Sequence, residues 1–193
     1  ILTMMIEKNM SFEDALKLAQ DNGYAEKDPT ADVEGHDACR KICILASLCF
    51  GKHVYPDSVY TEGITKITLD DVAYIGAFGG VIKLLGRAKR MDDGKIFAIV
   101  SPAIVMDGSQ LASVNDVFNA ILVRGDATGD VVFYGKGAGK LATASAVVGD
   151  VIDCASNHEE RKFFGWEDEK ADYIECCKNV ETALFVRVKT ACS

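Results

Sequence analysis

The chain has 193 residues, of which 49% are hydrophobic and 26% are charged, a balance that suits one globular domain with a core, or a domain with an appendage. Its formal net charge of -8 argues against nucleic-acid binding, because no basic stripe is present to neutralise phosphates. No apolar run approaches the roughly 20 residues that a helix needs to span a bilayer. The seven cysteines are odd in number and irregularly spaced, which is typical of reduced thiols in the cytoplasm.

Two short helices are expected at the start of the chain. Residues 1–8 have the pattern of a helix whose front is missing. Ser11 is a predicted N-cap, with Asp14 at the capping-box position, and an apolar stripe runs from Phe12 to Ala19. Gly23 follows that stripe, where a glycine commonly ends a helix. This role explains Gly23 by itself, although a glycine also lets a ligand approach the backbone closely.

An acidic loop then leads into a helix that is expected from about Gly35 to Phe50. The helix is apolar nearly all round, which is typical of a buried helix. Lys41 is therefore unusual, since lysine is almost never fully buried unless it is paired. Asp37 lies four residues earlier on the same helical face and is the natural partner. A structural ion pair at the exposed first turn and a catalytic pair are both consistent with this spacing.

Cys39 and Cys43 share a face of this helix and raise the question of a metal site. There is no Cys-x-x-Cys motif, and the nearest histidines, His36 and His53, do not complete a recognised zinc spacing. We therefore predict that these cysteines are small buried core residues. No metal site is expected from them.

The segment from Ala19 to Lys41 resembles the signature of homoserine dehydrogenases. Many spaced positions match, which is far more specific than a single glycine motif. The matching positions are Ala19, Gly23, Tyr24, Ala25, Asp28-Pro29, Asp32-Val33, Gly35, Asp37 and Lys41. The resemblance extends over residues 1–155, which we predict to be one catalytic domain for substrate binding and oligomerisation.

The middle of the chain predicts one helix and several strands. Thr68 or Asp70 is expected to cap a short helix, and Asp93-Gly94 is a hairpin signal between apolar runs at Val81–Arg90 and Lys95–Val105. Two more strands are expected at 117–125 and 131–134. Together these elements predict an α+β fold with a mostly antiparallel or mixed open sheet packed against helices.

A glycine-rich loop from Gly135 to Lys140 precedes a helix expected at 143–155. It is not a P-loop, because Gly135 and Gly139 are one residue too close and Leu141 replaces the hydroxyl residue. It is not a dinucleotide fingerprint either, because no second parallel strand follows at the right distance. Two roles remain possible for this loop: an ordinary tight turn between a strand and a helix, or a site where backbone N–H groups contact an anion or an amide. The resemblance implies that Gly139 lies against the cofactor.

The last part of the chain predicts a linker and one strand. Residues 156–181 are rich in charge, and the apolar residues Leu184, Val186 and Val188 share one face of a strand expected at 182–189. The resemblance implies that residues 182–193 open a truncated C-terminal regulatory domain of the ACT type.

The resemblance implies that this chain is a fragment of an NAD(P)-dependent homoserine dehydrogenase. The cofactor would be bound mainly by an N-terminal nucleotide-binding domain, which the fragment lacks. The whole enzyme would interconvert L-homoserine and L-aspartate 4-semialdehyde with NADP or NAD, in threonine, methionine and isoleucine biosynthesis. A cytoplasmic enzyme that forms a homodimer or higher homo-oligomer is expected, and the isolated fragment is expected to be inactive. Gly23 and Gly139 would border the nicotinamide.

The resemblance also implies roles for the polar residues of the signature. Lys41 would transfer the proton as general acid or base, and Asp37 would orient Lys41 or hold the substrate. Glu26 would bind the amino-acid end of the substrate. Asp32 would support the substrate site.

Two other functions fit the same residues. The chain would equally suit a non-catalytic oligomerisation domain whose acidic residues are merely solvated. The carboxylates of Glu26, Asp28, Asp32 and Asp37 would also suit a hard cation, although the segment lacks the EF-hand spacing and its glycine.

Overall fold

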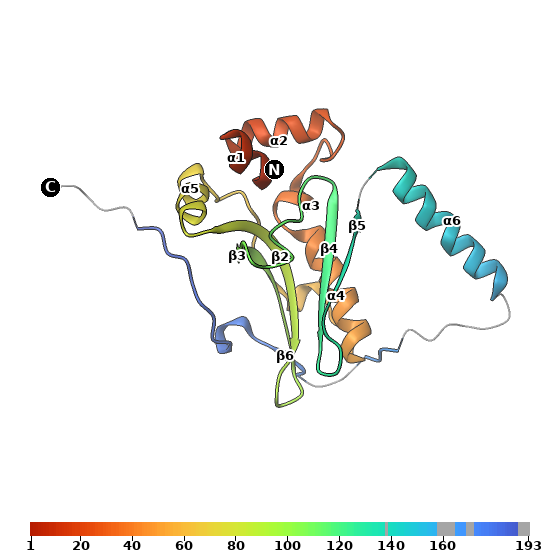
Figure 1. The fold of residues 1–193 in the computed structure, drawn as a ribbon. Helices are drawn as coiled ribbons and strands as arrows, with labels where there is room; N and C mark the ends of the chain where they lie inside the picture. Colours follow the sequence, from red (N-terminus) through yellow and green to blue (C-terminus); the bar gives the residue numbers. More distant parts are fainter. Residues whose placement is uncertain (138, 158–164, 169–171, 189–193) are drawn as a thin grey trace. The chain divides into compact units, whose positions relative to one another are not determined.

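The computed structural model describes residues 1–137, 139–157, 165–168 and 172–188 (Figure 1). The chain forms two compact units. The first contains Ile1–Pro29, Val72–Lys83 and Ala103–Phe164, and the second contains Thr30–Asp71, Leu84–Pro102 and Gly165–Ser193. Among the described residues, no helix has both the length and the apolar character that crossing a membrane requires.

The first unit begins with helices α1 (Leu2–Lys8) and α2 (Phe12–Asp21). The predicted N-cap is confirmed, because the Asp14 backbone N–H donates to Ser11 Oγ over 3.1 Å. Asp14 contributes a variant of the capping box, since its carboxylate accepts from Ser11 Oγ over 2.8 Å. Gly23 has φ 72° after α2 and donates its N–H to the Gln20 carbonyl, while the N–H of Tyr24 donates to the Ala19 carbonyl. This is a Schellman motif, so the conformational role predicted for Gly23 is confirmed.

The second unit begins with helices α3 (Thr30–Val33) and α4 (His36–Phe50). Gly35 and Gly51 flank α4 in the left-handed conformation, and the predicted bounds of this helix are confirmed. However, Ile44 and Leu48 are 54% and 48% exposed. The prediction of a helix buried all round is therefore wrong, because in this unit α4 buries only one face.

A mixed sheet lies beneath the buried face of α4. It contains β1 (Tyr60–Thr61), β2 (Gly80–Arg90), β3 (Ile96–Met106) and β6 (Ile174–Glu175). The strand order is β1-β3-β2, and both β1 and β6 pair parallel to β3. The hairpin between β2 and β3 closes where predicted, and the Met91 N–H donates to the Lys95 carbonyl over 2.8 Å. The 3₁₀ turn η1 (Pro56–Ser58) precedes β1.

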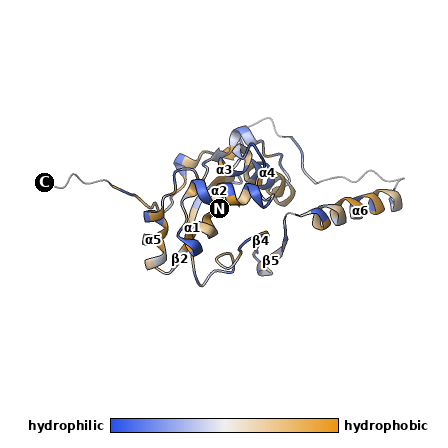
Figure 2. Ribbon diagram, turned by 90° about the horizontal axis from the view of Figure 1, so that it is seen from above, coloured by the Kyte–Doolittle hydropathy of each residue, from blue (hydrophilic) through white to orange (hydrophobic). Residues whose placement is uncertain are grey.

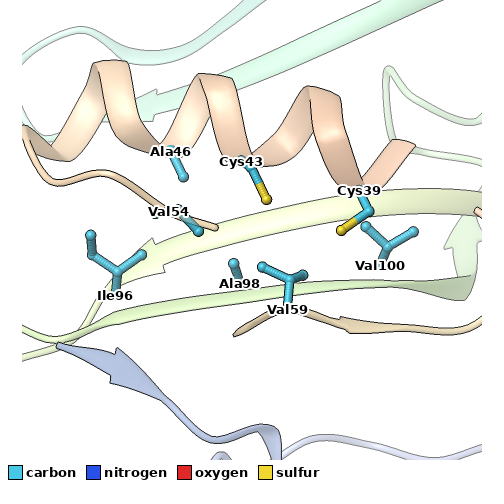
Figure 3. Close-up of a cluster of buried hydrophobic side chains, with 8 residues drawn as sticks. All are labelled: Cys39, Cys43, Ala46, Val54, Val59, Ile96, Ala98 and Val100. Carbon is cyan, nitrogen blue, oxygen red and sulfur yellow. The ribbon is translucent and has the colours of Figure 1, made fainter. Parts of the chain in front are cut away.

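The core of the second unit joins α4 to this sheet, as Figure 3 shows. The helix side chains point toward those of the strands and the adjoining loops. The buried cluster contains Cys39, Cys43, Ala46, Val54, Val59, Ile96, Ala98 and Val100. A side chain at Gly86 of β2 would place its Cβ 3.0 Å from Ile42 Cβ, so this glycine permits the close approach of α4. The predicted α+β fold with a mixed sheet packed against helices is confirmed.

The remaining elements are α5 (Leu69–Ala77), the antiparallel pair β4 (Phe118–Gly125) and β5 (Gly129–Lys136), and α6 (Lys140–Ser156). Each corresponds to a predicted element, although α6 begins three residues earlier than expected. Figure 2 shows many apolar residues along α6, and none of its described residues is buried.

Two predictions about the C-terminal part need revision. Within the predicted linker, Ile174 and Glu175 form β6 on the edge of β3, and a 3₁₀ turn, η2 (Cys177–Asn179), follows. The strand expected at 182–189 is not formed in the described residues 182–188, where Leu184 is 80% exposed. A strand requires a neighbour for its backbone hydrogen bonds, and these residues pair with no strand that the structure describes. Residues 189–193 lie outside the described part of the chain.

Candidate active site

Lys41 and Asp37 form an ion pair on the exposed side of α4. Lys41 Nζ lies 2.7 Å from Asp37 Oδ2, and the two side chains are 63% and 47% exposed. The predicted pairing is confirmed, but Lys41 is not a cation inside a buried helix. Asp37 lies in the first turn of α4, where a carboxylate interacts favourably with the helix dipole. The pair therefore presents an amine and a carboxylate together to solvent or to a ligand.

The other two predicted carboxylates lie in the segment before α4. Asp32 lies in α3, and its residue is exposed. Glu26 is exposed in the loop after α2, and Gln20 Nε2 ties that loop to the helix by donating to the Glu26 carbonyl over 2.9 Å. Glu26 belongs to the first unit, whereas Asp32, Asp37 and Lys41 belong to the second. The expectation that Lys41 faces Glu26 therefore stays a prediction.

Gly23 and Gly139 line one open cavity of about 730 Å³ in the first unit. Its wall comes from the end of α2 and the start of α6 and consists of Asn22, Gly23, Tyr24, Gly139, Lys140, Thr143 and Ala144. Gly139 has φ 116°, and a Cβ added to either glycine would meet nothing within 4 Å. The structure thus brings the two predicted cofactor-binding glycines to one cavity. Sequence analysis did not predict that Lys140 and Tyr24 would line this cavity. Of the two, only Tyr24 could have been found from the sequence, because it occupies a position of the family signature.

The described residues give no support to a metal site. No group of three or more His, Cys, Asp or Glu residues among them is arranged to hold an ion. Cys39 and Cys43 are buried in the core, and the Cys39 thiol donates weakly to the Pro56 carbonyl over 3.8 Å. Burial, followed by the neighbouring Cys39 thiol, raises the pKa of Cys43 to about 12. Both cysteines are therefore buried core residues, as predicted.

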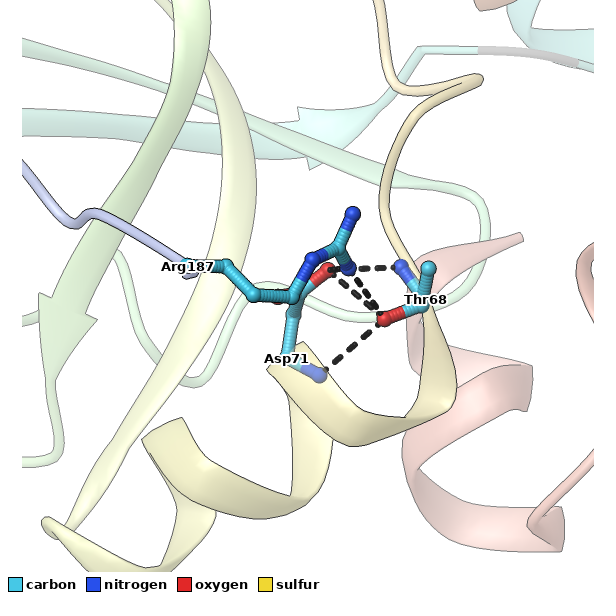
Figure 4. Close-up of polar contacts among 3 residues, drawn as sticks. All are labelled: Thr68, Asp71 and Arg187. Carbon is cyan, nitrogen blue, oxygen red and sulfur yellow. Dashed lines mark hydrogen bonds and ion pairs between the residues drawn. The ribbon is translucent and has the colours of Figure 1, made fainter. Parts of the chain in front are cut away.

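Sequence analysis also missed a second charged cluster, at the start of α5 (Figure 4). The buried Asp71 carboxylate accepts hydrogen bonds from the Thr68 N–H over 2.9 Å, from Thr68 Oγ1 over 2.8 Å and from Arg187 Nη1 over 2.5 Å. The Asp71 N–H in turn donates to Thr68 Oγ1, which completes a capping box. The Thr68-x-x-Asp71 spacing was visible in the sequence, but the partnership with Arg187 was not.

Comparison with known proteins identifies the family. The family model described as homoserine dehydrogenase matches residues 1–152. This chain belongs to the homoserine dehydrogenase family. The homoserine dehydrogenase of Pseudomonas aeruginosa is 49% identical over 154 residues, and that of Bacillus subtilis is 45% identical over 157 residues. The matches cover 79% and 81% of this chain.

Solved structures of homoserine dehydrogenases agree with this family assignment. A Staphylococcus aureus crystal structure at pH 7.5 matches with a TM-score of 0.76 and 44% identity over 83% of this chain and 40% of its own. A Thiobacillus denitrificans structure matches with a TM-score of 0.78 and 41% identity over 85% and 39%. A hyperthermophilic archaeal homoserine dehydrogenase in complex with NADPH has a TM-score of 0.63 and 28% identity over 80% and 43%.

The chain spans only part of its homoserine dehydrogenase relatives. It covers 35% of the P. aeruginosa protein and 36% of the B. subtilis protein. The family match ends at residue 152. The boundaries predicted at residues 155 and 181 stay predictions.

Proposed function

We propose that this chain supplies the substrate-binding and oligomerisation part of an enzyme that interconverts L-homoserine and L-aspartate 4-semialdehyde with NADP or NAD. The observation that carries this proposal is the pairing of Lys41 with Asp37 on an exposed helix face, within the family signature. We place the enzyme in the cytoplasm, in the biosynthesis of threonine, methionine and isoleucine. The family model matches residues 1–152, and the chain covers about a third of the P. aeruginosa relative. These two findings support the proposal that the chain is one part of the enzyme rather than a self-sufficient catalyst.

Lys41 is the proposed proton donor and acceptor. When the semialdehyde carbonyl is reduced to an alcohol, its oxygen needs a proton; when the alcohol is oxidised, a base must remove that proton. The Lys41 ammonium lies at the surface of α4 with a carboxylate 2.7 Å away, so it is accessible and oriented. Asp37 holds Lys41 in place and offers a second contact to the substrate. Bound nicotinamide would supply or accept the hydride.

Glu26 is the proposed contact to the amino-acid end of the substrate, and Asp32 is the proposed supporting carboxylate of the substrate site. The ammonium group of homoserine requires an accessible carboxylate, and the Glu26 residue is exposed on a loop whose backbone is held by Gln20. Asp32 adds negative charge one turn before α4. Carboxylates are suited to this task because charge-assisted hydrogen bonds are roughly twice as strong as neutral ones.

The cavity at Gly23 and Gly139 fits the nicotinamide end of the cofactor. A Cβ added to either glycine would meet nothing within 4 Å, which leaves room for a flat ring, and the cavity volume of about 730 Å³ is adequate for a ring and its attached groups. We assign the rest of the cofactor to the portion of the relatives that this chain does not span. The chain alone is accordingly expected to bind NAD(P)H weakly and to show no turnover with aspartate semialdehyde.

The test of the catalytic role is a Lys41→Ala substitution in the full-length enzyme. We expect turnover to fall by roughly 10²–10⁴, the usual effect of losing a general acid–base group. Lys66→Ala is a matched control, because Lys66 also forms an exposed i,i+4 ion pair, with Glu62, at 3.8 Å. Equal turnover in the Lys41→Ala variant and the wild type would exclude the catalytic role.

Self-association is the second part of this proposal, as a homodimer or a higher homo-oligomer. One face of the β4–β5 pair carries the exposed apolar side chains Ile121 and Phe133, which are cross-strand neighbours, together with Val123 and Val131. A two-stranded sheet is marginal in water unless such a face is covered. Sedimentation at micromolar concentration is expected to show a dimer or larger species, with Phe133→Ser shifting it toward monomer. A strictly monomeric wild type would contradict this part.

We also keep the proposal that residues 182–193 begin a regulatory domain of the ACT type. The apolar side chains of Leu184, Val186 and Val188 are 80%, 69% and 72% exposed. Exposed apolar residues on one face of a segment are typical of a surface that packs against another part of a protein. In that domain the segment would form a strand once neighbouring strands are present to pair with it.

A further inference from the structure

Gly63, in the loop after β1, lies where no side chain fits. Its φ is not positive, so the left-handed conformation is not the reason for a glycine here. A Cβ on Gly63, however, would lie 2.2 Å from the Val33 carbonyl oxygen and 2.5 Å from Glu34 Cα. Among the glycines that the structure describes, no other Cβ would come so close to a backbone atom. The backbone at the end of α3 therefore rests directly on Gly63.

Hydrogen bonds on both sides of Gly63 fix this contact. The Glu62 N–H donates to the carbonyl of Val100 in β3 over 2.8 Å, which attaches the loop to the central strand of the sheet. The Ile64 N–H donates to the Val33 carbonyl over 2.8 Å, which attaches the end of α3 to the same loop. Gly63 and Val33 are both buried. The contact thus joins α3 to the sheet through backbone atoms, whose positions are more restricted than those of flexible side chains.

The segment that rests on Gly63 leads directly into the candidate active site. Asp32 lies in α3, and Gly35 turns the chain with φ 79° before α4 begins. A Cβ on Gly35 would lie 3.2 Å from Val100 Cγ1, so this turn also packs closely on β3. Asp37 follows in the first turn of α4 and pairs with Lys41. A displacement of the backbone at the end of α3 would therefore be transmitted to the start of α4.

We propose that Gly63 is a positioning residue for the substrate site, because it lets the junction between α3 and α4 lie directly on the sheet. This inference rests on the proposed function. It assigns Gly63 no contact with the substrate, only the placement of Asp32, Asp37 and Lys41. A methyl group at Gly63 would force the Val33 carbonyl away by roughly 1 Å, since the packed interior leaves no other space for it. A misplacement of this size is enough to lower catalysis about 10²-fold.

The test is steady-state kinetics of a Gly63→Ala variant of the full-length enzyme. We expect the KM for L-homoserine to rise about tenfold and kcat/KM to fall about 10²-fold. The KM for NAD(P) is expected to stay at the wild-type value, because the proposed cofactor cavity lies in the first unit and Gly63 in the second. A role in stability alone would lower the fraction of folded enzyme, and so the apparent kcat, without changing the KM for homoserine.

Two further variants separate positioning from stability. Ile96→Val is the matched control, because Ile96 is fully buried in the core of the same unit, at the hairpin end of β3. Loss of its methyl group is expected to lower the urea midpoint while the KM for homoserine stays at the wild-type value. Thr65→Val keeps Gly63 and removes only the hydroxyl that donates to Glu34 Oε1 over 3.1 Å. It is expected to raise the KM for homoserine about two- to threefold with an unchanged urea midpoint.

The outcomes distinguish this inference from the proposed function. If the wild-type enzyme is active, an unchanged KM for homoserine in Gly63→Ala, or an equal change in Ile96→Val, would overturn the role of Gly63 alone. If Gly63→Ala does not fold, Thr65→Val decides, and a wild-type KM in that variant would show that the loop only maintains the fold. A wild-type full-length enzyme without homoserine dehydrogenase activity would overturn the proposed function and this inference together.

Discussion

Two ion pairs in the second unit have similar distances and very different surroundings. Lys41 and Asp37 lie 2.7 Å apart with side chains that are 63% and 47% exposed, whereas Arg187 and Asp71 lie 2.5 Å apart with the aspartate side chain only 6% exposed. Asp71 also accepts two hydrogen bonds from Thr68. Exposed ion pairs contribute little to stability, while a buried carboxylate depends on its partners. The comparison therefore separates a pair available for chemistry from a pair that maintains the fold.

The largest expected effect concerns the exposed pair. Lys41→Ala is expected to lower turnover of the full-length enzyme by roughly 10²–10⁴. In contrast, the free energy of unfolding should change by about 0.5 kcal/mol or less, because an exposed i,i+4 pair contributes only that much. Urea unfolding and steady-state kinetics on the same preparation measure both quantities. A large loss of stability in this variant would mean that the pair is structural.

The next effect concerns the buried carboxylate. Asp71→Ala removes the carboxylate half of the α5 capping box and the partner of Arg187, and we expect a loss of about 2–3 kcal/mol in the free energy of unfolding. Arg187→Met leaves the carboxylate with its Thr68 donors and is expected to cost less, because the arginine side chain is 48% exposed. Urea unfolding of both variants checks this order. The Asp70→Ala variant is a control for helix-terminal charge, since Asp70 lies in the same first turn.

Arg187 is also expected to hold residues 181–188 on the second unit. These residues form no helix or strand, so side-chain contacts such as the one to Asp71 and Thr68 must fix them. Arg187→Met is therefore expected to accelerate proteolytic cleavage within this segment by several-fold, while cleavage elsewhere is unchanged. Identical cleavage patterns for wild type and variant would show that other contacts hold the segment.

The features that sequence analysis predicted correctly are those set by neighbouring residues. Ser11 with Asp14, Gly23 after α2 and Asp93-Gly94 in the hairpin each determine their local structure within a few positions. The spacing of Asp37 and Lys41 likewise sufficed to predict their ion pair. The catalytic role proposed for this pair rests on the family signature, because spacing alone also permits a structural pair.

The features that were missed depend on residues far apart in the chain. Arg187 reaches Asp71 across 116 residues, and no local pattern predicts such a partner. The exposure of Lys41 was misjudged because the apolar character of α4 does not reveal how many of its faces are covered. In the second unit the sheet covers one face of α4. Ile44 and Leu48 lie on a face of this helix that the sequence predicted as buried, and they are exposed.

The smallest expected effect comes from a third pair, at the closed end of the β4–β5 hairpin. Arg124 Nε and Nη2 donate to the two oxygens of the Asp130 carboxylate over 2.6 and 2.9 Å. The pKa of Asp130 is lowered from its ordinary value of 3.8, mainly because its carboxylate accepts hydrogen bonds from Arg124. A carboxylate whose pKa is lower in the folded state stabilises the protein above its unfolded pKa, and this contribution is lost as the pH falls through the lowered value.

Asp130→Asn tests this pair by its pH dependence. The variant is expected to be slightly less stable than the wild type near neutral pH, and this difference should vanish as the pH falls below 3.8 toward the lowered pKa. Asp126→Asn, in the adjoining turn, is a suitable control, because its side-chain oxygen accepts from the Ala127 N–H and an amide oxygen can replace it. Urea unfolding at several pH values measures the difference. A difference that persists unchanged into acid would show that the geometry of Asp130, rather than its charge, stabilises the hairpin.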